Sequence, residues 1–296
     1  MKTPVFTGAA VAIITPFTED NKINYPKLGE LIEYQIANGT DAVVICGTSG
    51  ESPCMPHEEH LEAIRFAVDT VAKRVPVIAG TGSNDTAYAI GLSNDAEKLG
   101  ADALLMVTPY YNKTSQAGLI RHYHTIADNV SAPIIVYNVP SRTGVRITAE
   151  TYKALSEHPR INGTKEASGD ISLVAETRAL CGDELNIWSG NDDQILPITA
   201  LGGKGVISVL SHIAPKETHD IVMECINGNL EKARALQLEY FDLCKDLFID
   251  VNPIPVKAAL NMMGWNVGKC RLPLTDLSEQ AEAHLRATLQ KHGLVK

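Results

Sequence analysis

One lysine could form a covalent bond with a substrate. Lys165 ends a short apolar run, and the alternation of side chains along a strand places Gly163 and Ala167 on its face. These small neighbours would leave room for the long side chain at the end of a sheet. Burial there would lower the pKa of the amine and free it to attack a carbonyl carbon. The alternative is a surface lysine paired with Glu166 or Asp170.

Hydroxyl groups and an arginine follow other apolar runs and could bind a substrate or move a proton. The segment 47–50 (Gly-Thr-Ser-Gly) could hold a carboxylate on its backbone N–H groups, or form only a tight turn. Tyr111 and Tyr137 could relay protons, since a phenol both donates and accepts, although packing is the commoner role of tyrosine. Arg142 could clamp a carboxylate through two hydrogen bonds, or serve a structural ion pair.

The histidines are not spaced as a metal site requires. His57 and His60 are three residues apart, whereas the H-E-x-x-H zinc motif needs four. His122 and His124 are two apart and diverge on a helix. We therefore expect no metal ion and no other cofactor. In an aldol-type reaction without a metal, a lysine imine supplies the electron sink.

Eight short apolar runs predict the strands that position these residues. Each run is followed by a longer amphipathic stretch, a pattern typical of a parallel sheet covered by helices. The expected strands are Ala9–Ile14, Ala42–Cys46, Val75–Ala79, Ala103–Val107, Pro133–Tyr137, Ile161–Lys165, Asn186–Ser189 and Gly205–Val209. Eight units within about 210 residues favour an α/β fold of the (β/α)8 barrel type. A doubly wound sheet would use fewer strands and a glycine-rich loop after the first one.

The active site of such a barrel lies at the carboxyl ends of the strands, where the candidate side chains stand. From about Pro215 onward the strand pattern stops and only helices are expected. These helices are Ile221–Ile226, Leu230–Leu247, Pro255–Met263 and Leu277–Leu289. We therefore expect a catalytic barrel over residues 1–214 and a C-terminal helical extension over residues 215–296.

Composition limits the class of function. The chain has 296 residues, a net charge of −9 and 45% hydrophobic residues, which excludes a disordered or fibrous protein. The acidic balance argues against nucleic acid and anionic membranes as partners, because both need a basic face. No apolar run reaches the roughly 18 residues of a membrane span, and Ala9–Ile14 lacks the flanks of a signal peptide. The six cysteines read as reduced thiols, so we expect a cytoplasmic protein.

Taken in order, the strand-end segments resemble those of the pyruvate-dependent class I aldolases of the dihydrodipicolinate synthase / N-acetylneuraminate lyase family. The resemblance runs from Gly8 through the segment 15–17 (Thr-Pro-Phe) to the helical C-terminus. It implies that Lys165, in the segment 163–169 (Gly-Thr-Lys-Glu-Ala-Ser-Gly), forms an imine with pyruvate. The derived enamine would attack L-aspartate 4-semialdehyde. Ring closure would release 4-hydroxy-tetrahydrodipicolinate, which opens the diaminopimelate and lysine pathway.

The resemblance also implies a proton relay and an oligomer. Thr48, Tyr137 and Tyr111 match the relay of the family, with Tyr111 contributed across a tight dimer interface. The protein should therefore be at least a homodimer, and typically a homotetramer. Thr48 and Ser49 would hold the pyruvate carboxylate, although many members have a second threonine in place of Ser49.

The remaining substrate contacts distinguish members of the family. Gly190 and Ile207 match positions that line the pyruvate side, and Arg142 matches the residue that binds the semialdehyde carboxylate. Aldolases for sialic acid or keto-sugar acids usually depart from Ser-Arg-Thr-Gly at this place. The arginine therefore favours the synthase over two alternatives. These are another pyruvate-dependent aldolase or lyase with the same lysine, and a catalytically silent ligand-binding barrel.

Feedback-regulated members bind L-lysine at the tight dimer interface, and part of that site is matched. The matching residues are Ser52, His57, His60, Asn84 and Tyr110. Tyr88 falls where a glutamate commonly binds the amino group of the inhibitor. The lost charge-assisted contact would be worth about 1.5–3 kcal/mol. The resemblance thus implies lysine inhibition that is retained in part but weakened.

Overall fold

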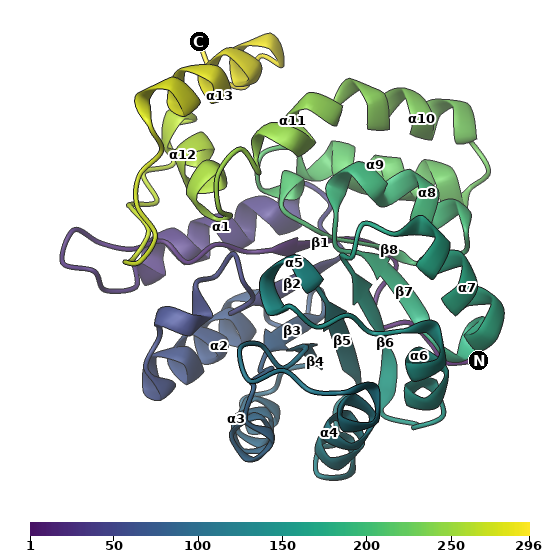
Figure 1. The fold of residues 1–296 in the computed structure, drawn as a ribbon. Helices are drawn as coiled ribbons and strands as arrows, with labels where there is room; N and C mark the ends of the chain where they lie inside the picture. Colours follow the sequence, from purple (N-terminus) through teal and green to yellow (C-terminus); the bar gives the residue numbers. More distant parts are fainter.

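Eight parallel strands form a closed barrel surrounded by helices (Figure 1). The computed structural model describes residues 1–296. The strands pair in chain order, and the eighth closes on the first with Gly8 opposite Gly205. They are β1 (Gly8–Ala12), β2 (Ala42–Ile45), β3 (Val77–Gly80), β4 (Ala103–Val107), β5 (Ile134–Asn138), β6 (Ile161–Glu166), β7 (Asn186–Ser189) and β8 (Gly205–Ser208). The expected (β/α)8 barrel is confirmed.

Helices connect successive strands and cover the outside of the barrel. They are α1 (Tyr25–Ala37), α2 (His57–Val71), α3 (Thr86–Lys98), α4 (Gln116–Asp128), α5 (Pro140–Thr143), α6 (Ala149–Ser156), α7 (Ile171–Cys181), α8 (Ile195–Ala200) and α9 (Pro215–Ile226). Several begin at a side chain that accepts a hydrogen bond from the first turn, as Asp85 does for α3 and Ser115 for α4. No helix is long and apolar enough to cross a membrane.

The amino-terminal end of the barrel is closed by aromatic packing. Trp188 of β7 is fully buried, its ring stacks on Phe6 at 5.1 Å, and its N–H donates to the Phe6 carbonyl. Gly163 makes this possible, since a Cβ there would lie 2.7 Å from the Trp188 ring. The Trp188 ring therefore occupies the space beside Gly163, which the sequence had suggested for the side chain of Lys165. With this end filled, the open end of the barrel is the carboxyl end.

The chain after the barrel strands is helical, with one difference from expectation. The helices are α10 (Leu230–Glu239), α11 (Phe241–Asp246), α12 (Ile254–Met262) and α13 (Glu279–Lys291). The expected single helix over 230–247 is wrong, because the chain breaks at Tyr240, whose ring stacks on His292 at 5.2 Å. Leu243, in the helix after the break, is fully buried.

The last helices lie along one side of the barrel (Figure 1). Helix α9 begins at Pro215, earlier than expected, with proline in the first turn where its missing N–H costs nothing. It packs against β1 and α8, and α10 packs on it in turn. Helices α12 and α13 pack on each other beyond α11. The division of the chain at residue 215 stays a prediction.

Candidate active site

A cavity of about 340 Å³ opens at the carboxyl ends of the strands. Its walls come from β1, β2, β4, β5 and β6, from the segment after β7, from α5, and from the segment between α11 and α12. The expected site residues that line it are Thr48, Ser49, Tyr137, Arg142, Lys165 and Gly190. Residues far apart in the sequence thus surround one space large enough for a small organic acid.

Lys165 lies in this cavity with only 5% of its surface exposed. Burial lowers the pKa of its amine to about 8, the nearby Asp192 carboxylate opposes that shift, and Arg142 adds to it. The Nζ atom lies 4.3 Å from the centre of the Tyr137 ring. An amine with this pKa is neutral often enough near pH 7 to act as a nucleophile. The interpretation of Lys165 as a surface residue is wrong.

Glu166, the neighbour of Lys165, points away from the cavity and holds the end of β6. Its carboxylate accepts hydrogen bonds from Asn138 Nδ2 at 3.0 Å and from the Tyr152 hydroxyl at 2.7 Å. The backbone N–H of Ser168 also donates to it, at 2.7 Å. These contacts fix the strand end that carries the lysine. Glu166 therefore contributes to the site through the backbone and does not pair with Lys165.

Small side chains make the room that Lys165 occupies. Gly190 follows β7, and a Cβ there would lie 3.1 Å from Lys165 Cε and 2.7 Å from Ala167 Cβ. Ala167 was expected to leave this space, and Gly190 was expected to line the pyruvate side. Both residues line the cavity beside the lysine.

Tyr137 and Thr48 face the same space. Burial raises the pKa of the Tyr137 phenol, while Arg142 and the Thr48 hydroxyl oppose this shift. The phenol therefore keeps its proton near pH 7 and can donate it. Together with the hydroxyl of Thr48, it provides two exchangeable protons at the wall of the cavity.

Arg142 stands at the mouth of the cavity on the short helix α5. The helix is tied to the barrel by Thr143, whose hydroxyl accepts a hydrogen bond from Thr108 at 2.9 Å. The guanidinium donates to the carbonyl of Asn252 at 3.1 Å and forms no ion pair within the chain. With no ion pair inside the chain, its other N–H groups can bind an anion.

The segment 248–252 completes the wall, and sequence analysis missed it. Asn252 is buried, lines the cavity and donates from Nδ2 to the Ser49 hydroxyl at 2.9 Å. Its Oδ1 atom is buried without a partner in the chain. Phe248 and Val251 line the same side. No motif marks this loop, because only the folded chain brings it back over strands that precede it by more than 80 residues.

Two expected site residues lie outside the cavity. Ile207 of β8 is buried in the apolar interior of the barrel, in the same cluster as Tyr137. Tyr111, after β4, is 91% exposed and does not line the cavity of its own chain. No three His, Cys, Asp or Glu side chains are grouped where they could hold a metal ion.

Comparison with known proteins identifies the family. The sequence model described as the Dihydrodipicolinate synthetase family matches residues 5–292. The chain is 55% identical over 295 residues to the 4-hydroxy-tetrahydrodipicolinate synthase of Acetivibrio thermocellus, covering 100% of each chain. The chain belongs to the dihydrodipicolinate synthetase family.

Solved structures of dihydrodipicolinate synthases superpose closely on this family member. The chloride-inhibited enzyme of Acinetobacter baumannii, complexed with pyruvate, is 41% identical with a TM-score of 0.96, over 98% of this chain and 99% of that one. The enzyme of Cyanidioschyzon merolae, with lysine bound, is 39% identical with a TM-score of 0.96, over 99% and 100%. The fold of the family thus extends through the C-terminal helices of this member.

A second cavity of about 470 Å³ adjoins the first in this dihydrodipicolinate synthetase family member. The two share Thr48, Tyr137 and Arg142 in their walls. The residues expected at an inhibitor site that line the second cavity are Ser52, His60 and Tyr110, and Tyr88 joins them. An effector in this cavity would therefore lie against residues of the active site.

The other two residues expected at the inhibitor site do not line the second cavity but contact residues that do. Asn84 donates to the carbonyl of Tyr110 at 3.2 Å, and His57 Nδ1 lies 3.3 Å from the Tyr88 hydroxyl. Tyr88 therefore places a phenol at the wall of the second cavity. Burial lowers the pKa of His60, whose Nε2 lies 2.9 Å from the Gly80 carbonyl. His60 is thus neutral near pH 7 and adds no charge to this cavity.

Proposed function

We propose that this chain condenses pyruvate with L-aspartate 4-semialdehyde to give 4-hydroxy-tetrahydrodipicolinate. The observation that carries the proposal is the buried amine of Lys165, with its lowered pKa, in a cavity that also holds hydroxyl groups and an arginine. Full-length relatives at more than half identity bear the name of this activity. The proposed chemistry uses side chains of this cavity together with Tyr111 of a second copy of the chain.

The first half of the reaction makes the imine. The neutral amine of Lys165 attacks C2 of pyruvate, whose carboxylate is held by the hydroxyls of Thr48 and Ser49. The oxygen of C2 then leaves as water after protonation by Tyr137. Thr48 and Tyr111 of the partner subunit return that proton from solvent. The imine becomes an enamine when its methyl group loses a proton, which the same relay carries back to solvent, with the lysine nitrogen as the electron sink.

The second half forms the carbon–carbon bond and frees the lysine. The enamine carbon attacks the aldehyde of the semialdehyde, and the relay protonates the resulting alkoxide. Arg142 binds the semialdehyde carboxylate at the mouth of the cavity, where its guanidinium has free donors. The amine of the second substrate then attacks C2 and displaces Lys165, which closes the ring and restores the free enzyme.

Reduction with borohydride in the presence of pyruvate tests the imine. We expect a pyruvate-derived mass on the peptide that contains Lys165, found by mass spectrometry, and none in the variant Lys165→Met. Absence of the adduct from the unchanged protein would reject every Schiff-base function, including the alternative of another pyruvate aldolase. A silent ligand-binding barrel would give that result. Turnover with aspartate semialdehyde but not with N-acetylneuraminate would then select the synthase.

We also propose that the working unit is a homodimer or homotetramer in the cytoplasm. Tyr111 is exposed, as are Tyr88 and Tyr110, which line one cavity, and a second copy packed there would cover them. The six free cysteines support a reducing compartment. Mixing inactive Lys165→Met and Tyr111→Phe subunits tests the shared tyrosine. Recovery of activity in mixed dimers supports it, and none would reject it.

A further inference from the structure

The turn that carries Thr48 and Ser49 is anchored mainly from outside itself. It contains two backbone hydrogen bonds between residues three apart in the sequence. The N–H of Gly50 donates to the Gly47 carbonyl and the N–H of Glu51 to the Thr48 carbonyl, both at 3.1 Å. Glu51 ends the turn with a φ of 57°, a conformation that costs energy for a residue with a side chain. External contacts must therefore maintain it.

The side chain of Glu51 supplies the strongest of these contacts. Its Oε1 lies 2.6 Å from the Nζ of Lys257, and the two side chains are 1% and 2% exposed. The Oε2 atom accepts a hydrogen bond from the backbone N–H of Arg271 at 2.8 Å. Lys257 also donates to the carbonyl of Lys269 at 3.0 Å and lies 4.2 Å from the centre of the Phe17 ring. Both charges are thus paired and hydrogen-bonded.

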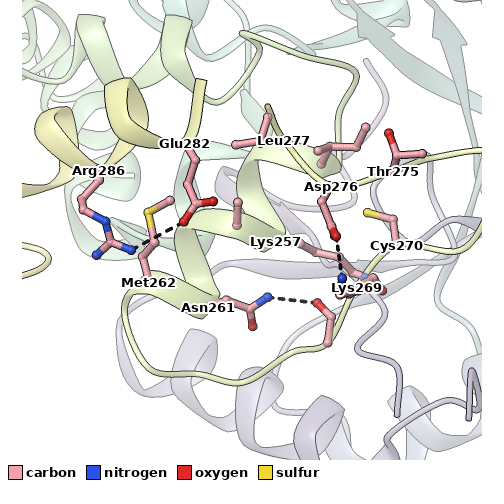
Figure 2. A pocket seen from close by; sticks show the side chains of 13 residues that line it. Lys257, Asn261, Met262, Lys269, Cys270, Thr275, Asp276, Leu277, Glu282 and Arg286 are labelled. Carbon is pink, nitrogen blue, oxygen red and sulfur yellow. Dashed lines mark hydrogen bonds and ion pairs between the residues drawn. The ribbon is translucent and has the colours of Figure 1, made fainter. Parts of the chain in front are cut away.

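One segment of the C-terminal extension therefore holds the turn at two points. Asn252 binds the Ser49 hydroxyl, and Lys257, five residues later on α12, binds Glu51. Figure 2 shows Lys257 among the residues of a cavity bounded by α12, the loop that follows it and α13. The ion pair of Lys269 and Asp276 lies at the same cavity and is exposed.

We propose that Glu51 and Lys257 are positioning residues, whose buried ion pair holds the Thr48–Ser49 turn in the geometry that binds the pyruvate carboxylate. The inference rests on the proposed function. A buried ion pair contributes little stability compared with apolar groups of the same size, because removing both charges from water is costly. Its value here lies in geometry: it fixes two hydroxyl groups at the wall of the cavity. The extension is then part of the catalytic unit.

The double variant Glu51→Gln/Lys257→Met separates geometry from stability. It leaves no unpaired buried charge, so we expect a thermal unfolding midpoint within a few degrees of the unchanged protein. The pyruvate concentration that half-saturates borohydride trapping should rise about tenfold, the equivalent of one charge-assisted hydrogen bond. The KM for the semialdehyde should stay within about twofold to threefold, whereas kcat at saturating pyruvate should fall, because the same turn carries Thr48 of the proton relay.

A matched control and a second variant complete the test. Lys269→Met removes an exposed ion pair of the same extension and should leave all these quantities unchanged. Glu51→Gln alone keeps the acceptor for Arg271 and should give a smaller rise, of about threefold. An unchanged pyruvate half-saturation in a folded variant of either kind would overturn the proposal. Failure of the unchanged protein to trap pyruvate would instead reject the proposed function.

Discussion

Burial of one amine sets the pH dependence expected of the reaction. Because burial lowers the pKa of Lys165 to about 8, the reactive neutral form is a minority at pH 7. We expect the rate of imine formation at limiting pyruvate to rise about tenfold per pH unit below 8 and to level off above it. Borohydride trapping from pH 6 to 9.5 measures this profile. A flat profile, or an inflection near the ordinary lysine value, would contradict it.

The same burial makes Lys165 a cost to stability. Its pKa is about 10.4 in an unfolded chain and about 8 in the folded protein, so the folded state binds the proton more weakly. The cost is complete below pH 8 and vanishes above the unfolded value. Lys165→Met should therefore be inactive yet more stable at pH 7, by up to about 3 kcal/mol, or several degrees in thermal unfolding. The difference should shrink at pH 10. A less stable variant at pH 7 would contradict this account.

Arg142 should act on the second substrate more than on the first. Arg142→Ala removes the free N–H groups at the mouth of the cavity, so the KM for aspartate semialdehyde should rise about 10- to 100-fold. Pyruvate trapping should fall much less, and any loss near pH 7 should come from the higher pKa of Lys165 once Arg142 is absent. Arg142→Lys keeps the charge but loses the paired donors, so its KM for aspartate semialdehyde should lie between those of the unchanged protein and of Arg142→Ala. Equal loss of trapping and turnover would show that Arg142 acts on the first step.

At the scale of elements, replacing either of two glycines at neighbouring strands with alanine should have different effects: one should lower stability and the other should slow imine formation. A Cβ at Gly163 would lie 2.3 Å from the Asn186 carbonyl and 2.7 Å from Trp188, both fixed in the closed end of the barrel. Gly163→Ala should therefore lower the free energy of unfolding by about 1–3 kcal/mol or more. Urea unfolding measures it, and a neutral result would show that β6 and β7 can separate at little cost.

In Gly190→Ala the new Cβ would lie 2.7 Å from Ala167 Cβ and 3.1 Å from Lys165 Cε, with no backbone atom among its nearest contacts. Both Ala167 and the lysine side chain would have to move. We expect imine formation to fall more than tenfold, because reactivity depends on placement of the attacking atom, while the unfolding midpoint changes by only a few degrees. A less stable Gly190→Ala variant that still traps pyruvate fully would contradict this prediction and would show that Gly190 serves the fold rather than the placement of the amine.

At the scale of the whole molecule, the net charge of −9 cannot attract two carboxylate substrates. Local cations must do so, and Lys165 and Arg142 stand at the cavity. The same reasoning applies to an inhibitor with an amino group, which needs a local anion. Tyr88, 44% exposed and 3.3 Å from His57 through its hydroxyl, offers none.

Tyr88→Glu should therefore strengthen inhibition by L-lysine. One restored charge-assisted contact predicts a half-inhibitory concentration about 10- to 100-fold lower than that of the unchanged protein. Titration of turnover with L-lysine measures it, and Tyr88→Gln serves as the uncharged control. Equal inhibition of all three proteins would reject both the weakening and its explanation.

The sequence alone determined the barrel and the end of it that carries the chemistry. Strands buried on both faces are apolar over a few consecutive residues, and the alternation of side chains is local, so Lys165 could be placed at a strand end. Thr48, Tyr137, Arg142 and Gly190 could be placed beside it for the same reason. Their roles in catalysis, like those of Tyr111 and the inhibitor residues, stay predictions.

Only the tertiary structure decided what surrounds that lysine. The break at Tyr240 depends on packing against the residues after α13, which no local pattern encodes. Asn252 and Lys257 reach the turn after β2 across about two hundred residues of chain. Burial, and with it the pKa of Lys165, is a property of the closed barrel and its C-terminal segment together. Desolvation depends on every neighbour in space, whereas periodicity depends only on neighbours in sequence.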